Sequence, residues 1–118
     1  MNFNFWPFSR RRSNLPDSTP VRARFIRTDT PGKGELRVSS PLCRLGRAPD
    51  NDICLDNDSV SGCHAELYHL PDGAFQICDL DSTNGTWVNG KRIRVQILNS
   101  SDVVELGEVR LHFRIGDA

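Results

Sequence analysis

Residues 64–93 read HAELYHLPDGAFQICDLDSTNGTWVNGKRI, a series of short apolar runs separated by turn residues. The strongest turn signal is Asn89-Gly90, because both residues accept the positive φ that a two-residue hairpin requires. A second turn is indicated at Pro71–Gly73, where the proline presets φ and the glycine accepts a positive φ. Each turn stands between two runs of strand-forming residues, so this segment predicts two β-hairpins.

The same pattern continues on both sides of this segment, from Val21 to the last residues of the chain. Alternating or β-branched runs recur at intervals of about ten residues, with turn residues between them. No stretch of about twelve residues keeps the 3.6-residue apolar period of a helix together with helix caps. The expected strands are Ala23–Thr28, Glu35–Ser39, Leu42–Leu45, Asp52–Leu55, His64–His69, Phe75–Asp79, Thr86–Val88, Lys91–Ile93, Val95–Leu98, Val103–Leu106 and Val109–Ile115. The sequence therefore predicts an all-β sandwich of two packed antiparallel sheets.

Length and composition agree with one globular domain. The chain has 118 residues, of which 37% are hydrophobic and 25% charged, as expected for a single domain with its own core. The charge is uneven, because residues 1–28 hold six arginines against one aspartate, whereas the remainder carries nine basic and fourteen acidic side chains. Such an acidic body is a poor general surface for nucleic acid, so no specific nucleic-acid partner is expected.

Residues 1–20 are expected to form a flexible arm, and residues 21–118 the domain. The arm begins with the aromatic stretch MNFNFWPF and continues with Ser-Arg-Arg-Arg. Its apolar part is too short to cross a bilayer and precedes the basic residues, the reverse of a secretory signal. We expect Trp6 and Phe8 to dock on the domain or on a partner, with weak contact to a membrane interface as the alternative. The missing signal favours a cytoplasmic location.

Four cysteines occur singly, with no C-x-x-C pair: Cys43, Cys54, Cys63 and Cys78. Three of them lie in expected strands, where a free cysteine behaves as a small buried apolar residue, and a reducing cytoplasm fits them best. The aspartate-rich run Asp50–Asp58 resembles a calcium loop. Counted from Asp56, however, it lacks the glycine and the closing glutamate of that motif. Neither a metal nor a cofactor is therefore expected.

Three polar loops between the expected strands carry side chains that suit a phosphate ester. Arg47, in the first loop, offers a permanently charged fork of donors. Ser61, in the second, offers a hydroxyl, and Asn84, in the third, offers an amide that can bind peptide backbone. Ser82 and Thr83 add a pair of hydroxyls to the third loop. With no base or metal beside them, these side chains favour recognition of a phosphate over its hydrolysis.

His64 stands three residues after Ser61, a spacing that raises the question of a Ser–His nucleophile. Such a pair needs an imidazole within reach of the hydroxyl, a third group that orients it and an oxyanion site. Nothing else in the sequence clearly supplies those roles, and no cysteine has an activating neighbour in sequence. We therefore expect no enzyme activity, and we assign His64 to bracing its loop through hydrogen bonds.

Taken together, these residues resemble the forkhead-associated (FHA) domain, a phosphothreonine-recognition module. The core pattern of that family is Gly-Arg, then Ser-x-x-His, then Asn-Gly. Here it reads Gly46-Arg47, Ser61-Gly62-Cys63-His64 and Asn84-Gly85. The resemblance runs from about Val21 to about Ile115. It implies a β-sandwich of about eleven strands that binds a phosphothreonine-containing protein, a Ser/Thr kinase or its substrate, through loops at one end.

The resemblance also implies roles for individual residues. Arg47 and Ser61 would hold the phosphate, and Asn84 would bond the peptide backbone. Thr83 would contact the phosphate and the γ-methyl group of the phosphothreonine. The protein would then be a signalling adaptor. The residues that would shape its loops are Gly46, Gly62, His64 and Gly85.

One position departs from the family pattern. The residue after the motif serine is commonly basic in this family, and here it is Gly62. A charge-assisted hydrogen bond contributes about 1.5–3 kcal/mol, so its loss would weaken binding by about one to two orders of magnitude. Arg92 or Arg94, on the neighbouring hairpin, is a candidate to compensate. The departure leaves open an alternative, a phosphorylation-independent interaction scaffold of the same fold.

Threonine–proline pairs suggest one form of regulation. Thr19, in the arm, and Thr30 each precede a proline. If a kinase modified Thr19, the arm could fold back intramolecularly and occlude the Arg47 site at high effective concentration.

Overall fold

The computed structural model describes residues 21–30, 32 and 34–116, so the expected arm, residues 1–20, lies outside the described residues. Within the described residues the chain forms eleven strands and no helix. Every expected strand is present, with ends that differ from the prediction by at most one residue. The strands are β1 (Ala23–Arg27), β2 (Glu35–Val38), β3 (Leu42–Gly46), β4 (Ile53–Cys54), β5 (Ala65–His69), β6 (Phe75–Asp79), β7 (Thr86–Val88), β8 (Lys91–Ile93), β9 (Val95–Leu98), β10 (Val103–Leu106) and β11 (Val109–Ile115).

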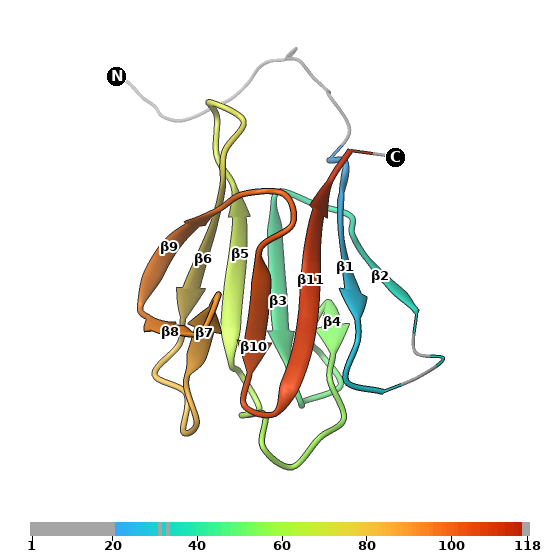
Figure 1. Ribbon diagram of the computed structural model, residues 1–118, viewed down its shortest axis with the longest axis vertical. Coiled ribbons are helices and arrows are strands. Elements are labelled where there is room, and N and C mark those ends of the chain that lie inside the picture. Colours follow the sequence, from blue (N-terminus) through green and yellow to red (C-terminus); the bar gives the residue numbers. More distant parts are fainter. Residues whose placement is uncertain (1–20, 31, 33, 117–118) are drawn as a thin grey trace.

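The strands form two sheets packed face to face (Figure 1). One sheet has six strands in the order β2-β1-β11-β10-β7-β8, and the other has five in the order β4-β3-β5-β6-β9. The predicted all-β sandwich is therefore confirmed. Neighbouring strands run antiparallel except β3 and β4, which pair in parallel. The sequence did not indicate this parallel pair, because a two-residue strand carries no alternation from which its direction can be inferred.

The core lies between the two sheets and follows the alternation of the strands. In β11, Val109, Leu111 and Phe113 are buried, and the residues between them face outward. Phe113 packs against Phe25 of the same sheet and Phe75 of the other, with ring centroids 5.1 and 5.3 Å apart. Tilted and edge-on aromatic pairs at such distances are favourable beyond the area they bury. This aromatic cluster holds the two sheets together at the centre of the sandwich.

Both hairpins of residues 64–93 form as predicted. Asn89 has φ 51° and Gly90 has φ 84°, the two positive values of a type I′ turn between β7 and β8. In the turn between β5 and β6, Gly73 has φ 93° and its N–H donates to the carbonyl of Leu70 at 2.9 Å. Turn chemistry therefore sets the register of these two strand pairs.

Strand direction brings the β3–β4, β4–β5, β6–β7 and β10–β11 loops to the same end of the sandwich, the lower end in Figure 1. The three loops that the sequence singled out are among them. At the opposite end β1 begins and β11 ends, with Ala23 paired to Ile115, so Val21 and Gly116, where the described chain begins and ends, lie there. The seven-residue strand β11 runs from one end to the other, a length of roughly 20 Å.

The cysteines differ in their burial. Cys43 is buried in β3, and this burial, with a smaller effect of the nearby Asp52 charge, raises the pKa of its thiol to about 12. Cys78 in β6 is partly buried. The prediction that Cys54 is buried is wrong, because β4 lies at a sheet edge and Ile53 takes the inward position. The described cysteines are all free thiols.

No helix in the described part of the chain is long and apolar enough to span a membrane. Among the same residues, no group of three or more histidine, cysteine, aspartate or glutamate side chains is placed to hold a metal ion. One aspartate of the calcium-like run, Asp52, instead accepts a hydrogen bond from the N–H of Arg44 at 2.8 Å.

Candidate functional site

The β3–β4 loop and the β4–β5 loop are held together by hydrogen bonds from backbone and side-chain donors. The N–H of Arg47 donates to the carbonyl of Ser61 at 2.9 Å. Asn51 Nδ2 donates to the carbonyl of Gly62 at 2.7 Å. The contact leaves no room for a side chain at Gly46, because a Cβ there would lie 2.2 Å from the Gly62 oxygen. Glycine at position 46 therefore lets the first two motif segments meet.

Arg47 has an exposed guanidinium whose direction is set by the neighbouring loop. Its Nε donates to the carbonyl of Val60 at 3.0 Å. Within the described residues, the two terminal nitrogens make no hydrogen bond or ion pair. The side chain is thus oriented by one donor and keeps its other donors available for an anion.

Ser61 carries a hydroxyl that is already used as an acceptor. Its Oγ accepts the N–H of Thr83 at 3.1 Å, and this bond links the β4–β5 loop to the β6–β7 loop. The hydroxyl hydrogen is left to donate to another group. Arg47 and Ser61 therefore offer a charged fork and a hydroxyl donor on two loops that are bonded to each other.

His64 is fully buried and joins the same two loops from the inside. Its Nδ1 accepts the N–H of Ser61 at 3.0 Å, so the ring proton lies on Nε2, which donates to the carbonyl of Gly85 at 2.9 Å. Burial lowers the pKa of this imidazole and outweighs the opposing effects of the Gly85 carbonyl and the Asp79 charge. Since backbone groups engage both ring nitrogens, His64 is not placed to take a proton from the Ser61 hydroxyl.

Asp79 anchors the β6–β7 loop, a role that the sequence pattern did not single out. Its Oδ1 accepts the hydroxyls of Ser82 and Thr86 at 2.6 and 2.7 Å, and its Oδ2 accepts the N–H of Ser82 at 3.1 Å. Burial of Asp79 opposes its ionisation, but these hydrogen bonds outweigh it and hold its pKa below the ordinary value. The expectation that Ser82 presents its hydroxyl beside that of Thr83 is wrong, because this carboxylate draws Ser82 inward.

Thr83 and Asn84 are the exposed residues at the tip of the same loop. Asn84 Nδ2 donates to the carbonyl of Ser59 at 2.8 Å, and the indole N–H of Trp87 donates to the carbonyl of Asn84 at 3.1 Å. These two bonds fix the position of the Asn84 amide. Across the described residues, its side-chain oxygen has no hydrogen-bond partner and is available to accept one from a ligand N–H.

Glycine is required at Gly85 but not at Gly62. Gly85 has φ 90°, and a Cβ there would lie 2.6 Å from Arg92 Nε and 3.0 Å from Trp87 Nε1. At Gly62, no neighbouring heavy atom lies within 4 Å of the position that a Cβ would take. Gly62 therefore has room for a side chain. Of the two arginines considered as compensation for Gly62, Arg92 reaches Gly85 at the edge of the β6–β7 loop.

The β10–β11 turn forms a further part of the site that the sequence did not predict. The N–H of Glu108 donates to Ser59 Oγ at 2.8 Å. Gly107 has φ 59°, and a Cβ there would lie 2.4 Å from the backbone carbonyl oxygen of Ser59. A cavity of about 370 Å³ opens here, lined by Ser59, Asn84, Trp87, Glu105, Gly107 and Glu108. The glycine between the last two strands signalled a turn, but its contact with Ser59 arises only in the folded chain.

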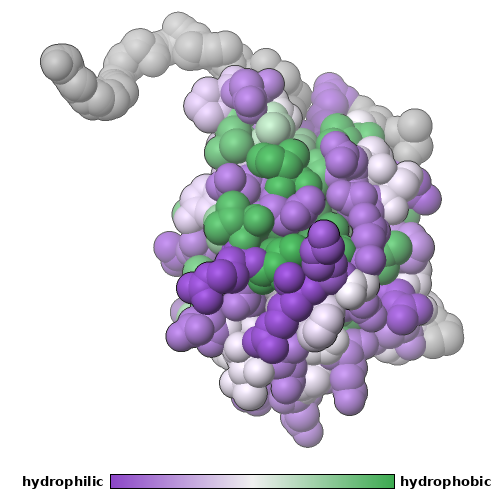
Figure 2. Space-filling view, turned by 60° about the vertical axis from the view of Figure 1, so that its left-hand side comes forward, coloured by the Kyte–Doolittle hydropathy of each residue, from purple (hydrophilic) through white to green (hydrophobic). Residues whose placement is uncertain are grey.

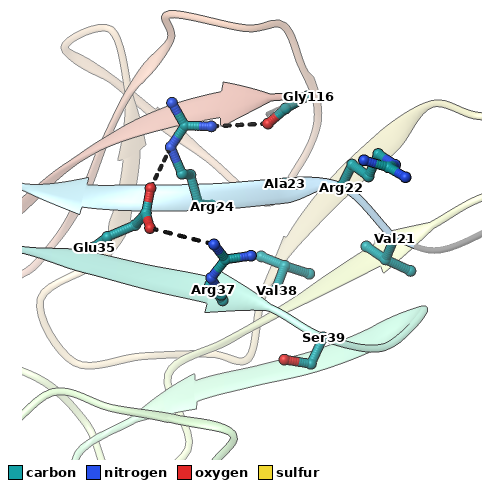
Figure 3. Close-up of a pocket in the computed structure, with 9 residues that line it drawn as sticks. All are labelled: Val21, Arg22, Ala23, Arg24, Glu35, Arg37, Val38, Ser39 and Gly116. Carbon is teal, nitrogen blue, oxygen red and sulfur yellow. Dashed lines mark hydrogen bonds and ion pairs between the residues drawn. The ribbon is translucent and has the colours of Figure 1, made fainter. Parts of the chain in front are cut away.

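A second hollow, of about 390 Å³, lies beside β1 and β2, away from the motif residues (Figure 3). Arg24 Nε forms an ion pair with Glu35 at 2.6 Å, and Arg24 Nη1 donates to the carbonyl of Gly116 at 2.8 Å. Arg37 Nη2 lies 3.9 Å from Glu35 on its other side. Both arginines therefore lie beside a carboxylate of the protein itself, Glu35. For this reason we place the candidate site at the loop end and not in this hollow.

Comparison with known proteins identifies the family. The FHA domain model matches residues 43–107, which is more than half of the chain and runs from β3 to β10. The oxoglutarate dehydrogenase inhibitor of Corynebacterium glutamicum is 34% identical over 112 residues, covering 95% of this chain and 76% of that protein. The glycogen accumulation regulator GarA of Mycolicibacterium smegmatis is 42% identical over 79 residues, covering 67% of this chain. The aligned part is 49% of GarA, so the chain spans about half the length of that relative.

A solved structure leads to the same conclusion. It comes from a structural and functional analysis of phosphothreonine-dependent FHA domain interactions, and it superposes with a TM-score of 0.74 at 26% identity. The superposition covers 82% of this chain and 99% of the other. The eleven-stranded sandwich, the matched residues and the likeness to these relatives agree, and the chain belongs to the FHA domain family.

Proposed function

We propose that this domain binds phosphothreonine-containing segments of partner proteins through the four loops at one end of the sandwich. The observation that carries the proposal is the exposed guanidinium of Arg47, which is oriented by Val60 and has no carboxylate partner among the described residues. A phosphate ester carries about −1.5 to −2 charges at pH 7 and three acceptor oxygens. Arg47 and the hydroxyl of Ser61 are the donors that would bind them.

The remaining ligand contacts fall to the β6–β7 loop. Asn84 would accept an N–H of the bound peptide through its side-chain oxygen, since its amide nitrogen is directed to Ser59. Thr83 is exposed and is joined to Ser61 by its own N–H, so it would lie beside the phosphate and the γ-methyl group. Gly46, His64 and Gly85 would hold the three motif loops in their relative positions.

We also propose that the domain, residues 21–118, acts without catalysis as an adaptor. Support comes from His64, whose two ring nitrogens are engaged by backbone groups, so that Ser61 lacks the base a nucleophile would need. A cytoplasmic location is supported by the free thiols of the described cysteines. The partner would be a Ser/Thr kinase or one of its substrates, bound through the phosphothreonine.

A phosphorylated Thr19 would reach this site from another copy of the chain and not from its own. Thr19 precedes Val21 by two residues, a span of at most about 7 Å. Val21 lies at the end of the sandwich opposite the loops, roughly 20 Å away along β11. Geometry therefore argues against the intramolecular contact expected from the sequence. Sedimentation of Thr19-phosphorylated protein should reveal concentration-dependent dimers, whereas occlusion within a monomer would contradict the proposal.

Titration of a phosphothreonine peptide library against the protein tests the main proposal. We expect binding that requires the phosphate and falls by about tenfold or more in Arg47→Ala and in Ser61→Ala, since each change removes a charge-assisted contact. Arg37→Ala is the matched control, because Arg37 is an exposed arginine on β2, far from the loops.

Equal binding of phosphorylated and unphosphorylated peptides would overturn the proposal and favour a phosphorylation-independent scaffold of the same fold. So would an equal loss of affinity in Arg47→Ala and Arg37→Ala, because that result would reflect net charge and not a specific contact.

A further inference from the structure

The edges of the two sheets differ in how they are protected. Strand order leaves β2 and β8 at the edges of one sheet and β4 and β9 at the edges of the other. Unpaired edges invite other strands, and proteins usually protect them with charged residues or by keeping the strand short. β2 carries Glu35 and Arg37, β8 carries Lys91 and Arg92, and β4 has only two residues. β9, which reads VQIL, has neither protection.

β9 also exposes large apolar side chains. Val95 is 56% exposed and Ile97 is 42% exposed. The register with β6 places them opposite Cys78 and Gln76 on the outer face of the five-stranded sheet. Figure 2, in which the side of the molecule that carries β9 is turned forward, shows apolar residues gathered on that side. Single exposed apolar residues are ordinary, but here two stand together on an open edge.

The same two residues present the unpaired backbone groups of the edge. The N–H of Asp79 donates to the carbonyl of Arg94 at 2.8 Å, so Arg94 belongs to a hydrogen-bonded pair of the β6–β9 ladder. Hydrogen-bonded and non-hydrogen-bonded pairs alternate along an antiparallel ladder. The N–H and C=O groups of Val95 and Ile97 therefore point away from β6, toward the open edge. A strand added there would gain backbone hydrogen bonds and apolar cover together.

We propose that residues 2–6 of the arm add to β9 as a sixth strand of this sheet. These residues read Asn-Phe-Asn-Phe-Trp, and the first four alternate polar and apolar as in a strand with one apolar face. Phe3 and Phe5 are two residues apart, the same spacing as Val95 and Ile97. In an added strand, both phenylalanines stand on one face and cover both exposed side chains of β9.

The arm is long enough to reach this edge. Phe5 lies sixteen positions before Val21, a contour length of up to about 53 Å. The longest dimension of the molecule is 44 Å. Leu98, the last residue of β9, pairs with Phe75 at the end of the sandwich where Val21 lies. The connection therefore runs along one end of the molecule and leaves the loop end open.

A second copy of the chain is a weaker candidate for the same edge. Two copies of β9 would meet along four residues each, a contact much smaller than the roughly 1,200–2,000 Å² that a stable interface buries. The arm needs no such area, because its attachment makes the contact intramolecular and gives a high effective concentration. The alternating phenylalanines also match β9 in spacing, which favours the arm as the occupant.

Amide hydrogen exchange of the full chain, read residue by residue by NMR, tests the proposal. We expect the amides of Val95 and Ile97 to exchange about tenfold or more slowly than in the double variant Phe3→Ser/Phe5→Ser. The control variant Asn2→Ser/Asn4→Ser alters the other face of the added strand and should keep the protection. Leu111 and Phe113 report on the fold and should exchange equally in all three proteins.

Three outcomes would overturn the proposal. Val95 and Ile97 amides that exchange as fast in the full chain as in the phenylalanine variant show that the arm does not cover the edge. Protection that survives removal of both phenylalanines assigns it to another cause. Protection that rises with protein concentration identifies a second copy as the occupant.

Discussion

Arg47 and Ser61 are each held by backbone groups of a neighbouring loop. The guanidinium donates one hydrogen bond to the carbonyl of Val60, and the hydroxyl accepts one from the N–H of Thr83. Neither bond uses the donors that a phosphate would need. A ligand that binds such side chains loses little of its binding energy to ordering them, because their directions are already set. The affinity of the site therefore depends on how many further donors surround the phosphate.

Replacing Gly62 with arginine is expected to strengthen phosphopeptide binding. The position has room for a side chain, and it lies next to Ser61 in the loop bonded to Arg47. A new charge-assisted hydrogen bond contributes about 1.5–3 kcal/mol, so Gly62→Arg should lower the Kd by about one to two orders of magnitude. Isothermal titration with one phosphothreonine peptide measures the change.

Gly62→Gln is the control for this variant, because glutamine is of similar length but uncharged. An equal gain in Gly62→Gln, or an equal gain for the unphosphorylated peptide, would show that the added contact is not made to the phosphate.

The buried His64 predicts a pH-dependent stability. Well above its ordinary pKa of about 6.5, the imidazole is neutral in both the folded and the unfolded chain and contributes no pH dependence. Burial lowers its pKa in the folded chain. As the pH falls below about 6.5, the unfolded chain takes up a proton first, so the free energy of unfolding decreases by up to about 1.4 kcal/mol per pH unit. Urea unfolding between about pH 7.5 and pH 5 measures this slope.

The slope should flatten in His64→Gln, even though that variant is less stable at every pH. Asp79 does not interfere in this range, because its pKa lies below the ordinary value of 3.8 and its contribution is lost only under more acidic conditions. A wild-type slope that persists unchanged in His64→Gln would contradict the assignment.

Residue types predicted the exposed part of the site better than its support. Arg47, Ser61 and Asn84 stand out in a sequence because each follows a strand and carries a donor or an amide. Asp79 and Ser82 look equally available in the sequence, yet the hydrogen bonds between them turn both inward. Whether a short polar side chain faces a ligand or the protein depends on partners that meet only when the chain folds.

At the scale of elements, alternation and turn residues were sufficient to predict the strands. Asn89-Gly90 and Pro71–Gly73 marked two hairpins, and the burial of alternate residues in strands such as β11 followed the expected period. The parallel pairing of β3 with β4 and the contact of the β10–β11 turn with Ser59 were not predictable. Both join segments that are separate in sequence, and neither is required by any local preference.

The contact between the β3–β4 and β4–β5 loops can be tested with two matched glycine variants. Gly46→Ala would place a Cβ 2.2 Å from the Gly62 carbonyl and should force the loops apart. Gly62→Ala adds the same methyl group on the other side of the contact, where nothing lies within 4 Å. We expect Gly46→Ala to lose about tenfold or more in phosphopeptide affinity and about 1–3 kcal/mol in stability, as overpacking does.

Gly62→Ala should remain close to wild type in both properties. Similar losses in the two variants, measured by peptide titration and urea unfolding, would show that the close approach at Gly46 does not organise the site.

In the whole molecule, the candidate ligand loops, the described chain ends and the exposed edge of β9 lie in three different places. The candidate ligand loops lie at one end, and Val21 and Gly116 lie at the other. The exposed edge of β9 runs along a side of the sandwich. A partner bound at the loops would therefore not collide with segments that continue from either described end, an arrangement that suits an adaptor.

NMR mapping of a bound phosphothreonine peptide on the full chain tests whether the four loops form the binding site. We expect phosphate-dependent shifts concentrated at Arg47, Ser61, Thr83 and Asn84, with none at the opposite end, around Val21, Ser39 and Gly116. The same peptide without phosphate should leave the loop signals in place. Shifts centred on the hollow beside β1 and β2, or equal shifts with and without phosphate, would contradict a phosphothreonine site built from the four loops.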